Sequence, residues 1–382
     1  MGEMLSMGVL GQSAKENEHR LPIHPRHFDR IDADLRAHMW LEEGYGRDFG
    51  VPDEALELMV AGLKTHTQIM DESDIVLLPK PTLSDVRQMR AGQALWGWPH
   101  CVQDTALTQV AIDHRLTLIA WEAMNHWTEH GTFVVHVFHM NNEIAGYASV
   151  LHAMILRGMT GAYGRKRKAV LLGFGNTARG AANALKSLGI TDIVALTMRE
   201  VEAVASPIPN VVLGHFDRMD GERSHTVTLK STGPVPTSEY LTEFDVIVNC
   251  VLQDTDDPMM FLGEDDLPRL APGTLIVDVS CDAGMGFPFA RPTTFEDPMF
   301  SVGTDVHYYG VDHSPSLLWE SATWEISEAI IPHIRSVMTG DTGWDENPTI
   351  GRAIEVRHGI VQNPKILSFQ NRSAEFPHPV VG

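Results

Sequence analysis

Apolar and polar positions recur along the first part of the chain with two spacings, one typical of buried strands and one of helices. Short apolar runs bounded by Gly, Pro or Asp predict strands, and apolar residues three and four apart predict helices between them. Thr82, with Asp85 three residues later, is the expected N-cap of one such helix. The alternation of strands and helices indicates a parallel sheet covered by helices. The expected strands are residues 7–11, 74–79, 93–99 and 116–121, and the expected helices are residues 24–34, 82–89 and 104–114.

A second α/β pattern occupies residues 168–312. A long helical pattern at residues 139–156 leads into it, and another at residues 316–338 is expected to return the chain to the first domain. We therefore predict an α/β fold of two doubly wound, parallel-sheet (Rossmann-like) domains with an active-site cleft between them. The tail, residues 339–382, has weak periodicity and is expected to form an extended arm. The predicted substrate domain is residues 1–145 plus 315–382, the predicted dinucleotide-binding domain is residues 146–314, and the strands expected in the latter are residues 169–172, 193–196, 211–213, 246–249, 274–279 and 306–311.

The composition excludes several classes of protein. Of 382 residues, 43% are hydrophobic and 21% are charged, as in globular proteins, and no apolar run approaches the length of a membrane span. The formal net charge of −21 argues against a nucleic acid or an anionic membrane as partner, and an anionic substrate would need local positive groups. The widely spaced Cys101, Cys250 and Cys281 form no zinc pattern, so no metal is expected. The same cysteines, together with the absence of a signal-peptide pattern, favour the cytoplasm.

The most informative motif is a strand-like apolar run followed by Gly173-Phe-Gly175-Asn176-Thr177-Ala178 and a helical pattern of small residues. Gly173 permits a tight turn, Gly175 lets the backbone approach a pyrophosphate, and Ala178 lets the helix pack closely on the strand. The helix N-terminus adds N–H donors and the positive end of a dipole. The pattern predicts a dinucleotide site that includes Asn176 and Thr177. The alternative is an ordinary strand–turn–helix.

The form of the nucleotide depends on the end of the next strand. Thr197 stands about 20 residues past the glycines, where an NAD-type fold usually has Asp or Glu, and Arg199 follows it. A hydroxyl and a guanidinium suit a 2′-phosphate, so we predict NADP(H) in preference to NAD(H), although Glu200 offers a carboxylate. Cys250 and Val251, which follow a later strand, are also expected to line the cofactor site.

Polar side chains follow three successive strands of the first domain, namely Lys80, His100 and Glu122. The carboxyl ends of parallel strands share one edge of the sheet, which is where ligands bind in open α/β folds. Each residue alone is more often a solvated surface group, but three at one edge predict a catalytic site. Arg20, in the charged loop after the first strand, is expected at the same edge as a carboxylate-binding group.

Two further candidates lie in the second domain. Asp282 follows a strand and precedes glycines, and we expect it near the nicotinamide; otherwise it is a turn-forming Asp. His313, preceded by Asp312, ends another strand and is a candidate substrate-binding residue; the alternative is a hinge before a helix that begins with Ser-Pro.

Together, these motifs resemble the alanine dehydrogenase/pyridine nucleotide transhydrogenase family and the saccharopine dehydrogenases, over roughly residues 7–335. The resemblance implies that Arg20 and Lys80 bind the carboxylate of an oxo acid. It implies that His100 acts in acid–base chemistry, with Lys80 as a possible partner, and that Asp282 lies beside the nicotinamide. The motifs that carry the resemblance are Lys15-Glu-Asn-Glu-His-Arg20-Leu-Pro, Leu77-Leu-Pro-Lys80-Pro, His100, Trp121-Glu122, Gly173-Phe-Gly175-Asn-Thr-Ala178 and Asp278-Val-Ser-Cys-Asp282.

Within this group, residues 311–322 resemble the same segment of N5-(carboxyethyl)ornithine synthases, and alanine dehydrogenases differ there. This resemblance implies an NADPH-dependent oxidoreductase that acts on CH–NH bonds. It would condense a 2-oxo acid, expected to be pyruvate, with the amino group of an amino acid such as ornithine or lysine. His100 would exchange the protons, since an imidazole titrates near neutrality, and Glu122 would orient His100 or tune Lys80.

Three alternative functions remain. They are an alanine dehydrogenase-type enzyme, a saccharopine dehydrogenase-type enzyme and a non-catalytic NADP-binding protein. We expect a homo-oligomer in each case, because the tail offers a surface for contacts between copies.

Overall fold

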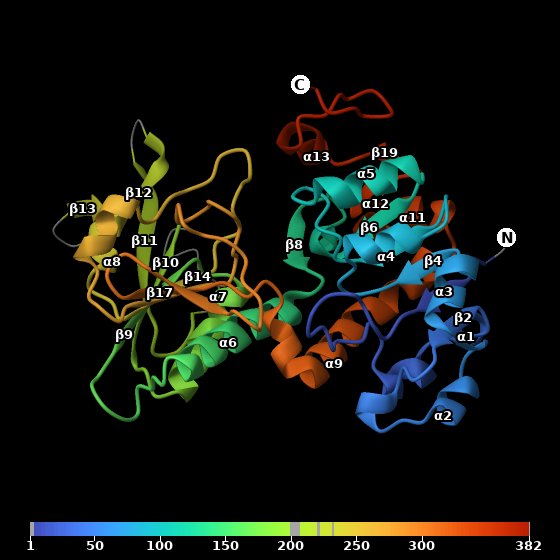
Figure 1. The fold of residues 1–382 in the computed structure, drawn as a ribbon, viewed down its shortest axis with the longest axis horizontal. Coiled ribbons are helices and arrows are strands. Elements are labelled where there is room, and N and C mark those ends of the chain that lie inside the picture. The colour runs from blue at the N-terminus through green and yellow to red at the C-terminus, as the bar shows by residue number, and fades with distance from the viewer. Residues whose placement is uncertain (1–3, 199–206, 220–221, 231–232, 382) are drawn as a thin grey trace. The chain divides into compact units, whose positions relative to one another are not determined.

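A computed structural model describes residues 4–198, 207–219, 222–230 and 233–381. The chain divides into two compact units, Met1–His139 with Trp319–Gly382, and Met140–Leu318. We call them unit 1 and unit 2. Each is a mixed α/β structure built on a mainly parallel sheet (Figure 1), as the sequence predicted. The assignment of substrate binding to one unit and nucleotide binding to the other stays a prediction.

Unit 1 is organised around an eight-stranded sheet of order β19-β18-β6-β5-β4-β1-β2-β3. The pairs from β6 to β3 are all parallel, whereas β18 pairs antiparallel with both of its neighbours. The strand order reverses between β1 and β4, since β2 and β3 follow on one side of β1 and β4 to β6 on the other, which makes this point the topological switch of the sheet. The strands are β1 (Met7–Val9), β2 (Met39–Glu42), β3 (Gly62–Lys64), β4 (Ile75–Leu77), β5 (Ala94–Gly97), β6 (Thr117–Ala120), β18 (Ile354–Arg357) and β19 (Ile360–Val361), and a separate hairpin consists of β7 (Asn125–Trp127) and β8 (Phe133–His136).

Both faces of this sheet are buried. Successive residues of its strands point to opposite sides, so each strand contributes side chains to two apolar clusters. In β4, Ile75 belongs to one apolar cluster and Val76 to the other. Ile326 and Val337, from the C-terminal segment, pack on the first face, so this segment completes the core. The helices of unit 1 are α1 (Ala33–Arg36), α2 (Asp53–Glu57), α3 (His66–Glu72), α4 (Leu83–Gln88), α5 (Thr105–Asp113), α9 (Trp319–Ile330), α10 (Ile334–Met338), α11 (Asp341–Glu346), α12 (Pro348–Gly351) and α13 (Pro364–Phe369).

The tail differs from the prediction of an extended arm, which was wrong. Residues 339–382 contain α11, α12, α13 and the strands β18 and β19. Figure 1 shows α13 near α5, and Gln370, just past α13, donates from its side-chain amide to the backbone oxygen of Cys101 over 2.6 Å. The helices and strands of the tail were not predicted because they are short and separated by Pro and Gly, so they give no long periodic pattern.

Unit 2 contains a nine-stranded sheet of order β13-β12-β11-β10-β9-β14-β15-β17-β16. The central strands are parallel, as predicted, while an antiparallel meander of β11, β12 and β13 forms one edge (yellow-green in Figure 1). The expected short strand at residues 211–213 is the beginning of the long β11. The strands are β9 (Lys168–Leu172), β10 (Asp192–Thr197), β11 (Val212–Met219), β12 (Glu222–Lys230), β13 (Gly233–Pro236), β14 (Val246–Asn249), β15 (Leu275–Asp278), β16 (Met299–Val302) and β17 (Val306–Tyr309).

Two helices of unit 2 touch through glycines. These helices are α6 (His139–Leu156) and α7 (Asn176–Ser187), and α8 (Thr237–Leu241) packs elsewhere on the sheet. A Cβ atom on Gly180 would lie 1.7 Å from the backbone oxygen of Glu143, and one on Gly146 would lie 1.9 Å from that of Thr177. The two backbones are therefore in direct contact, which fixes α7, and with it the turn at Gly175, against α6. Within the described residues, no helix has the length and hydrophobicity needed to cross a membrane.

We expect Gly180→Ala to destabilise the protein by about 1–3 kcal/mol, because the added methyl group overlaps the backbone of α6. Gly175→Ala is the matched control. Its Cβ would meet no atom within 4 Å, and its φ of −91° suits any residue, so the loss should stay below about 1 kcal/mol. Urea denaturation followed by circular dichroism measures both variants. Equal stability of the two would contradict the glycine contact.

Candidate active site

The ends of three neighbouring strands in unit 1 bring Lys80, His100 and Glu122 together. These residues follow β4, β5 and β6, which pair in parallel with Leu77 opposite Trp96 and Gly97 opposite Ala120. The register therefore places the three loops at one level of the sheet edge.

Gly97 allows the close approach of these loops. A Cβ atom at this position would lie 1.9 Å from the backbone oxygen of Leu78, so no other residue fits without a shift. The ladder continues past the strands, because the Trp98 N–H donates to the backbone oxygen of Pro79 over 2.9 Å. The segment that leads to His100 is thereby held against the segment that leads to Lys80.

The three side chains form a connected group. The Lys80 Nζ lies 2.9 Å from the His100 Nε2. The backbone N–H of His100 donates to the Glu122 Oε1 over 2.7 Å, and the His100 Nδ1 lies 3.9 Å from the same oxygen. His100 has a φ of 48°, which is uncommon for a residue with a side chain and is stabilised here by that bond to Glu122. With Lys80 charged, the ammonium donates to Nε2, and His100 is then neutral with its proton on Nδ1.

Glu122 is an unusual carboxyl group. Burial, and next the nearby carboxyl of Glu355, raise its pKa from 4.5 to about 8. Its Oε2 is buried and has no hydrogen-bond partner among the described residues. At neutral pH the proton is therefore mostly retained, and Glu122 can act as a neutral group beside His100.

Glu355 is a residue that the sequence did not identify. It lies on β18, at an irregularity in the pairing with β6, and it is 6% exposed. Such bulges redirect a side chain. The side-chain amide of Asn363 donates to its Oε2 over 2.7 Å, and burial raises its pKa. Since Glu355 comes from the far end of the chain, no local motif could have linked it to Glu122.

Arg20 is held by a partner that the sequence also missed. Its Nε donates to the Glu18 Oε1 over 2.8 Å, and its Nη2 pairs with the other carboxylate oxygen. Both side chains are almost fully buried, and the guanidinium carbon lies 5.1 Å from the centre of the Trp98 ring. Glu18 neutralises Arg20, so the positive charge predicted for this edge is greater at Lys80 than at Arg20.

In unit 2, the glycine turn has the geometry that a pyrophosphate requires. Gly173 has a φ of 97°, and a Cβ there would lie 3.2 Å from the backbone oxygen of Cys250. Gly175 precedes the first turn of α7 and faces open space. Asn176 and Thr177 begin the helix, while Ala178 is buried under it. These residues fit a dinucleotide: the cradle has no side chain where the phosphates would lie, and helix N–H groups border it.

The residues expected to select the nucleotide are only partly described. Thr197 ends β10 and is 4% exposed. Arg199 and Glu200 lie outside the described residues.

A buried network connects the loops after β14 and β15. The Asp278 carboxylate, fully buried, accepts hydrogen bonds from the Asn249 amide, the Cys281 N–H and the Tyr308 hydroxyl at 3.0, 2.9 and 2.9 Å. Burial raises the pKa of Asp278 to about 7. The Ser280 hydroxyl donates to the backbone oxygen of Val251 over 2.7 Å. Asp278 therefore fixes the loops that carry Cys250, Val251 and Asp282.

Asp282 and His313 were the other two candidates. Burial raises the pKa of Asp282 to about 6. His313 is 2% exposed, and its Nδ1 lies 2.6 Å from the Asp312 Oδ1 while Phe295 packs edge-on against the ring. Its environment in unit 2 is that of a buried, positioned imidazole. Among the described residues no group of three or more His, Cys, Asp or Glu could hold a metal ion.

Two sequence profiles of one family match most of the chain. The profile described as "Alanine dehydrogenase/PNT, N-terminal domain" matches residues 9–145, and "Alanine dehydrogenase/PNT, C-terminal domain" matches residues 147–364. The two matched ranges together include Lys80, His100, Glu122 and the glycine turn.

Individual relatives have low sequence identity to this chain, but each alignment spans most of both proteins. The N(5)-(carboxyethyl)ornithine synthase of Clostridium botulinum is 24% identical over 330 residues, which is 84% of this chain and 91% of that protein. The alanine dehydrogenase of Mycobacterium tuberculosis is 21% identical over 367 residues, 93% and 94% of the two chains. A solved L-alanine dehydrogenase has the same fold, with a TM-score of 0.72 at 18% identity over 96% of this chain and 99% of its own. The chain therefore belongs to the alanine dehydrogenase/PNT family, which binds pyridine nucleotides.

Proposed function

We propose that this protein is an NADPH-dependent oxidoreductase that condenses a 2-oxo acid, pyruvate in the first instance, with the amino group of an amino acid such as ornithine or lysine. The observation that carries the proposal is the contact of Lys80 with His100, beside the protonated Glu122, in a family that binds pyridine nucleotides. A relative named N(5)-(carboxyethyl)ornithine synthase supports the choice of substrates.

The reaction requires proton transfer in both directions. The amine must lose a proton before it attacks the oxo-acid carbonyl, and the resulting hydroxyl must gain one to leave as water and give an imine. Lys80 and His100 are 2.9 Å apart, so one proton can pass between them and be accepted or returned at either nitrogen. Bound NADPH supplies the hydride that reduces the imine.

The remaining residues would bind and orient the reactants. Lys80 supplies a positive charge for the carboxylate of the oxo acid, and Arg20 would share its guanidinium between Glu18 and that carboxylate. Glu122 keeps the backbone of His100 in its strained conformation and, as a neutral acid, does not itself cancel the charge of Lys80. Asp282 would lie beside the nicotinamide, and His313 would contact the substrate.

For the nucleotide, we propose NADP(H) over NAD(H). Thr197 at the end of β10, and Arg199 two positions later in the sequence, support a 2′-phosphate, since neither residue is the acid that commonly binds the two ribose hydroxyls of NAD. The turn from Gly173 to Ala178, with Cys250 and Val251 beside it, would hold the rest of the dinucleotide.

A second candidate is an alanine dehydrogenase-type reaction, in which ammonia is the amine. It is favoured by the alanine dehydrogenase relative, which aligns over 93% of this chain, compared with 84% for the synthase. The same proton and hydride steps serve both reactions, so the proton-transfer residues do not separate them.

A panel of amines and nucleotides tests the function. We expect NADPH oxidation with pyruvate plus ornithine or lysine, a secondary amine product by mass spectrometry, and a rate at least about tenfold lower with ammonia or with NADH. Turnover with pyruvate and ammonia alone would establish the second candidate. Preference for 2-oxoglutarate would indicate a saccharopine dehydrogenase-type enzyme, and nucleotide binding without any turnover would reject the proposal.

Substitution of His100 tests the acid–base assignment. His100→Ala should lower kcat by about 10²–10⁴-fold and leave NADPH binding unchanged, because proton transfer is lost while the nucleotide site stays intact. The control is His38→Ala, an exposed residue whose side chain has no hydrogen-bond or ion-pair partner among the described residues. Steady-state kinetics and nucleotide fluorescence titration give the two readouts. Full activity of His100→Ala would exclude His100 as the proton-transfer group.

The raised pKa of Glu122 predicts a dependence of stability on pH. The folded protein keeps this proton to about pH 8, whereas the unfolded chain releases it near 4.5, so the contribution to stability is lost as pH rises between these values. Glu122→Gln, which mimics the protonated form, should gain about 1–3 kcal/mol relative to wild type between about pH 5 and pH 9. Thermal unfolding at both pH values measures this, with the exposed Glu57→Gln as control. A difference independent of pH would show that Glu122 is ionised.

A further inference from the structure

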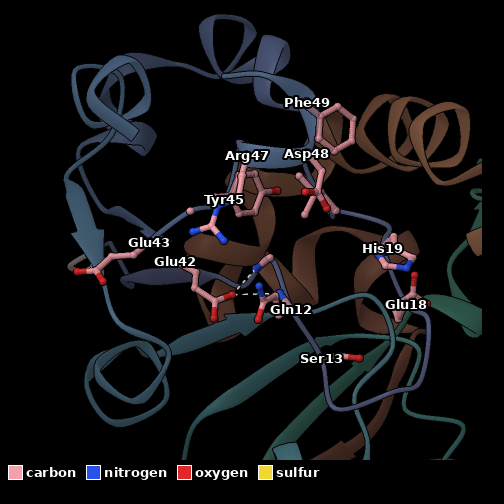
Figure 2. A pocket seen from close by; sticks show the side chains of 13 residues that line it. Gln12, Ser13, Glu18, His19, Glu42, Glu43, Tyr45, Arg47, Asp48 and Phe49 are labelled. Atoms are coloured by element: carbon pink, nitrogen blue, oxygen red, sulfur yellow. Dashed lines mark hydrogen bonds between the residues drawn. The ribbon is translucent and has the colours of Figure 1, made fainter. Parts of the chain in front are cut away.

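A pocket of about 290 Å³ opens next to the candidate active site, also at the sheet edge of unit 1. It is bordered by the loop that follows β1, from Gly11 to Leu21, and the loop that follows β2, from Glu42 to Phe49 (Figure 2). Its volume is at the lower end of the range for small-molecule sites. No sequence motif pointed to this pocket, because neither loop carries a recognised pattern beyond Arg20.

The walls of the pocket are held rigidly. The Glu42 Oε2 accepts the backbone N–H groups of Gly11 and Gln12 at 2.7 and 3.0 Å, and its Oε1 lies 3.0 Å from the His66 Nδ1. The Tyr45 hydroxyl donates to the backbone oxygen of Ile23 and accepts its N–H, at 2.6 and 3.0 Å. The two loops are thus bonded to each other, and the pocket does not depend on a ligand for its shape.

Two exposed side chains of opposite charge, Arg47 and Asp48, line this pocket. Within the part of the chain that the structure describes, no hydrogen bond or ion pair engages the Arg47 guanidinium or the Asp48 carboxylate. In Figure 2 the Arg47 guanidinium lies on the side of the pocket that faces Glu42 and Glu43, whereas Asp48 lies on the other side of Tyr45, near Phe49. By contrast, the other inner carboxylates are already bonded, Glu42 to the loop after β1 and Glu18 to Arg20. A ligand with one carboxylate and one ammonium would satisfy both open charges.

The strand order sets the distance from this pocket to the proposed chemistry. β2, β1 and β4 are neighbours in the sheet, so the end of β2 lies two strand spacings, about 10 Å, from the end of β4 that leads to Lys80. Glu18 connects the two places, since it lines the pocket and also pairs with Arg20. A molecule that reaches both must carry its reacting amine on a short methylene chain, away from its zwitterionic end. Ammonia cannot do so.

We propose that this pocket binds the α-carboxylate and α-ammonium of a diamino acid, with Arg47 contacting the carboxylate and Asp48 the ammonium, while the side-chain amine extends to Lys80 and His100. The proposal rests on the condensation reaction proposed above and adds the residues that select the amine. Tyr45 and Phe49 supply apolar surface for the methylene chain.

Direct binding tests the pocket without requiring turnover. Isothermal titration calorimetry with full-length protein and saturating NADP⁺ would compare L-ornithine, L-lysine and 1,4-diaminobutane, which is ornithine without its carboxylate. Wild type should bind one of the two amino acids at least about tenfold more tightly than the diamine. Arg47→Gln should remove most of this difference by weakening the amino acid only. Asp48→Asn should weaken the amino acids and the diamine alike.

The matched control is Arg335→Gln, which removes an exposed arginine paired with Asp32 and Asp34 elsewhere on unit 1. It should bind all three compounds as wild type does. Equal binding of the amino acid by Arg47→Gln and wild type would overturn the proposal, and so would a wild-type protein that binds neither amino acid. Turnover is read separately: binding by wild type without NADPH oxidation in the presence of pyruvate would reject the reaction while leaving the pocket assigned.

Discussion

The parallel pairing of β4, β5 and β6 is the constraint on which the candidate active site depends. Its register places the ends of the three strands at one level, and the backbone hydrogen bond from Trp98 to Pro79 extends the contact beyond β5. Gly97 is necessary for this, because any Cβ there would meet the backbone of Leu78. Without that close approach the Lys80 ammonium and the His100 ring would not come within hydrogen-bond distance. The proposed chemistry at this edge of the sheet therefore depends on the backbone geometry.

Burial of charge determines how the assembled groups differ from one another. The protein carries a net charge of −21, and both cations of the candidate site have an acidic neighbour: Arg20 pairs with Glu18, and Lys80 lies near Glu122. Arg20 is buried with Glu18 as its partner, and the net charge of this buried pair is close to zero. Glu122 lies near Glu355 and keeps its proton, so it does not cancel the charge of Lys80. An anionic substrate would then meet Lys80 as the main positive group.

The sequence predicted those parts of the structure that depend on neighbouring residues. The apolar runs of β4 to β6 and β9, the glycine turn and the polar residues at strand ends were all local signals, and the alternating burial of Ile75 and Val76 explains why such runs are readable. The strands β2 and β3 were missed, since β2 ends in Glu42 and β3 reads Gly-Leu-Lys, so neither shows the continuous apolar run that marks β4. Glu355 could not be found because its position beside Glu122 depends on a strand from the opposite end of the chain. Glu18 was seen only as part of a charged loop.

The strand order also separates two tasks within unit 1. Loops on one side of the switch point, after β4 to β6, carry the groups proposed to move protons, and loops on the other side, after β1 and β2, carry the pocket. A change in Arg47 or Asp48 leaves the register of β4, β5 and β6 untouched, because neither residue belongs to that set of pairings. On the assignment proposed above, the choice of amine would depend on the loop after β2 and not on the strands that hold Lys80 and His100. Such a separation would be compatible with a family whose members are named alanine dehydrogenase and N(5)-(carboxyethyl)ornithine synthase.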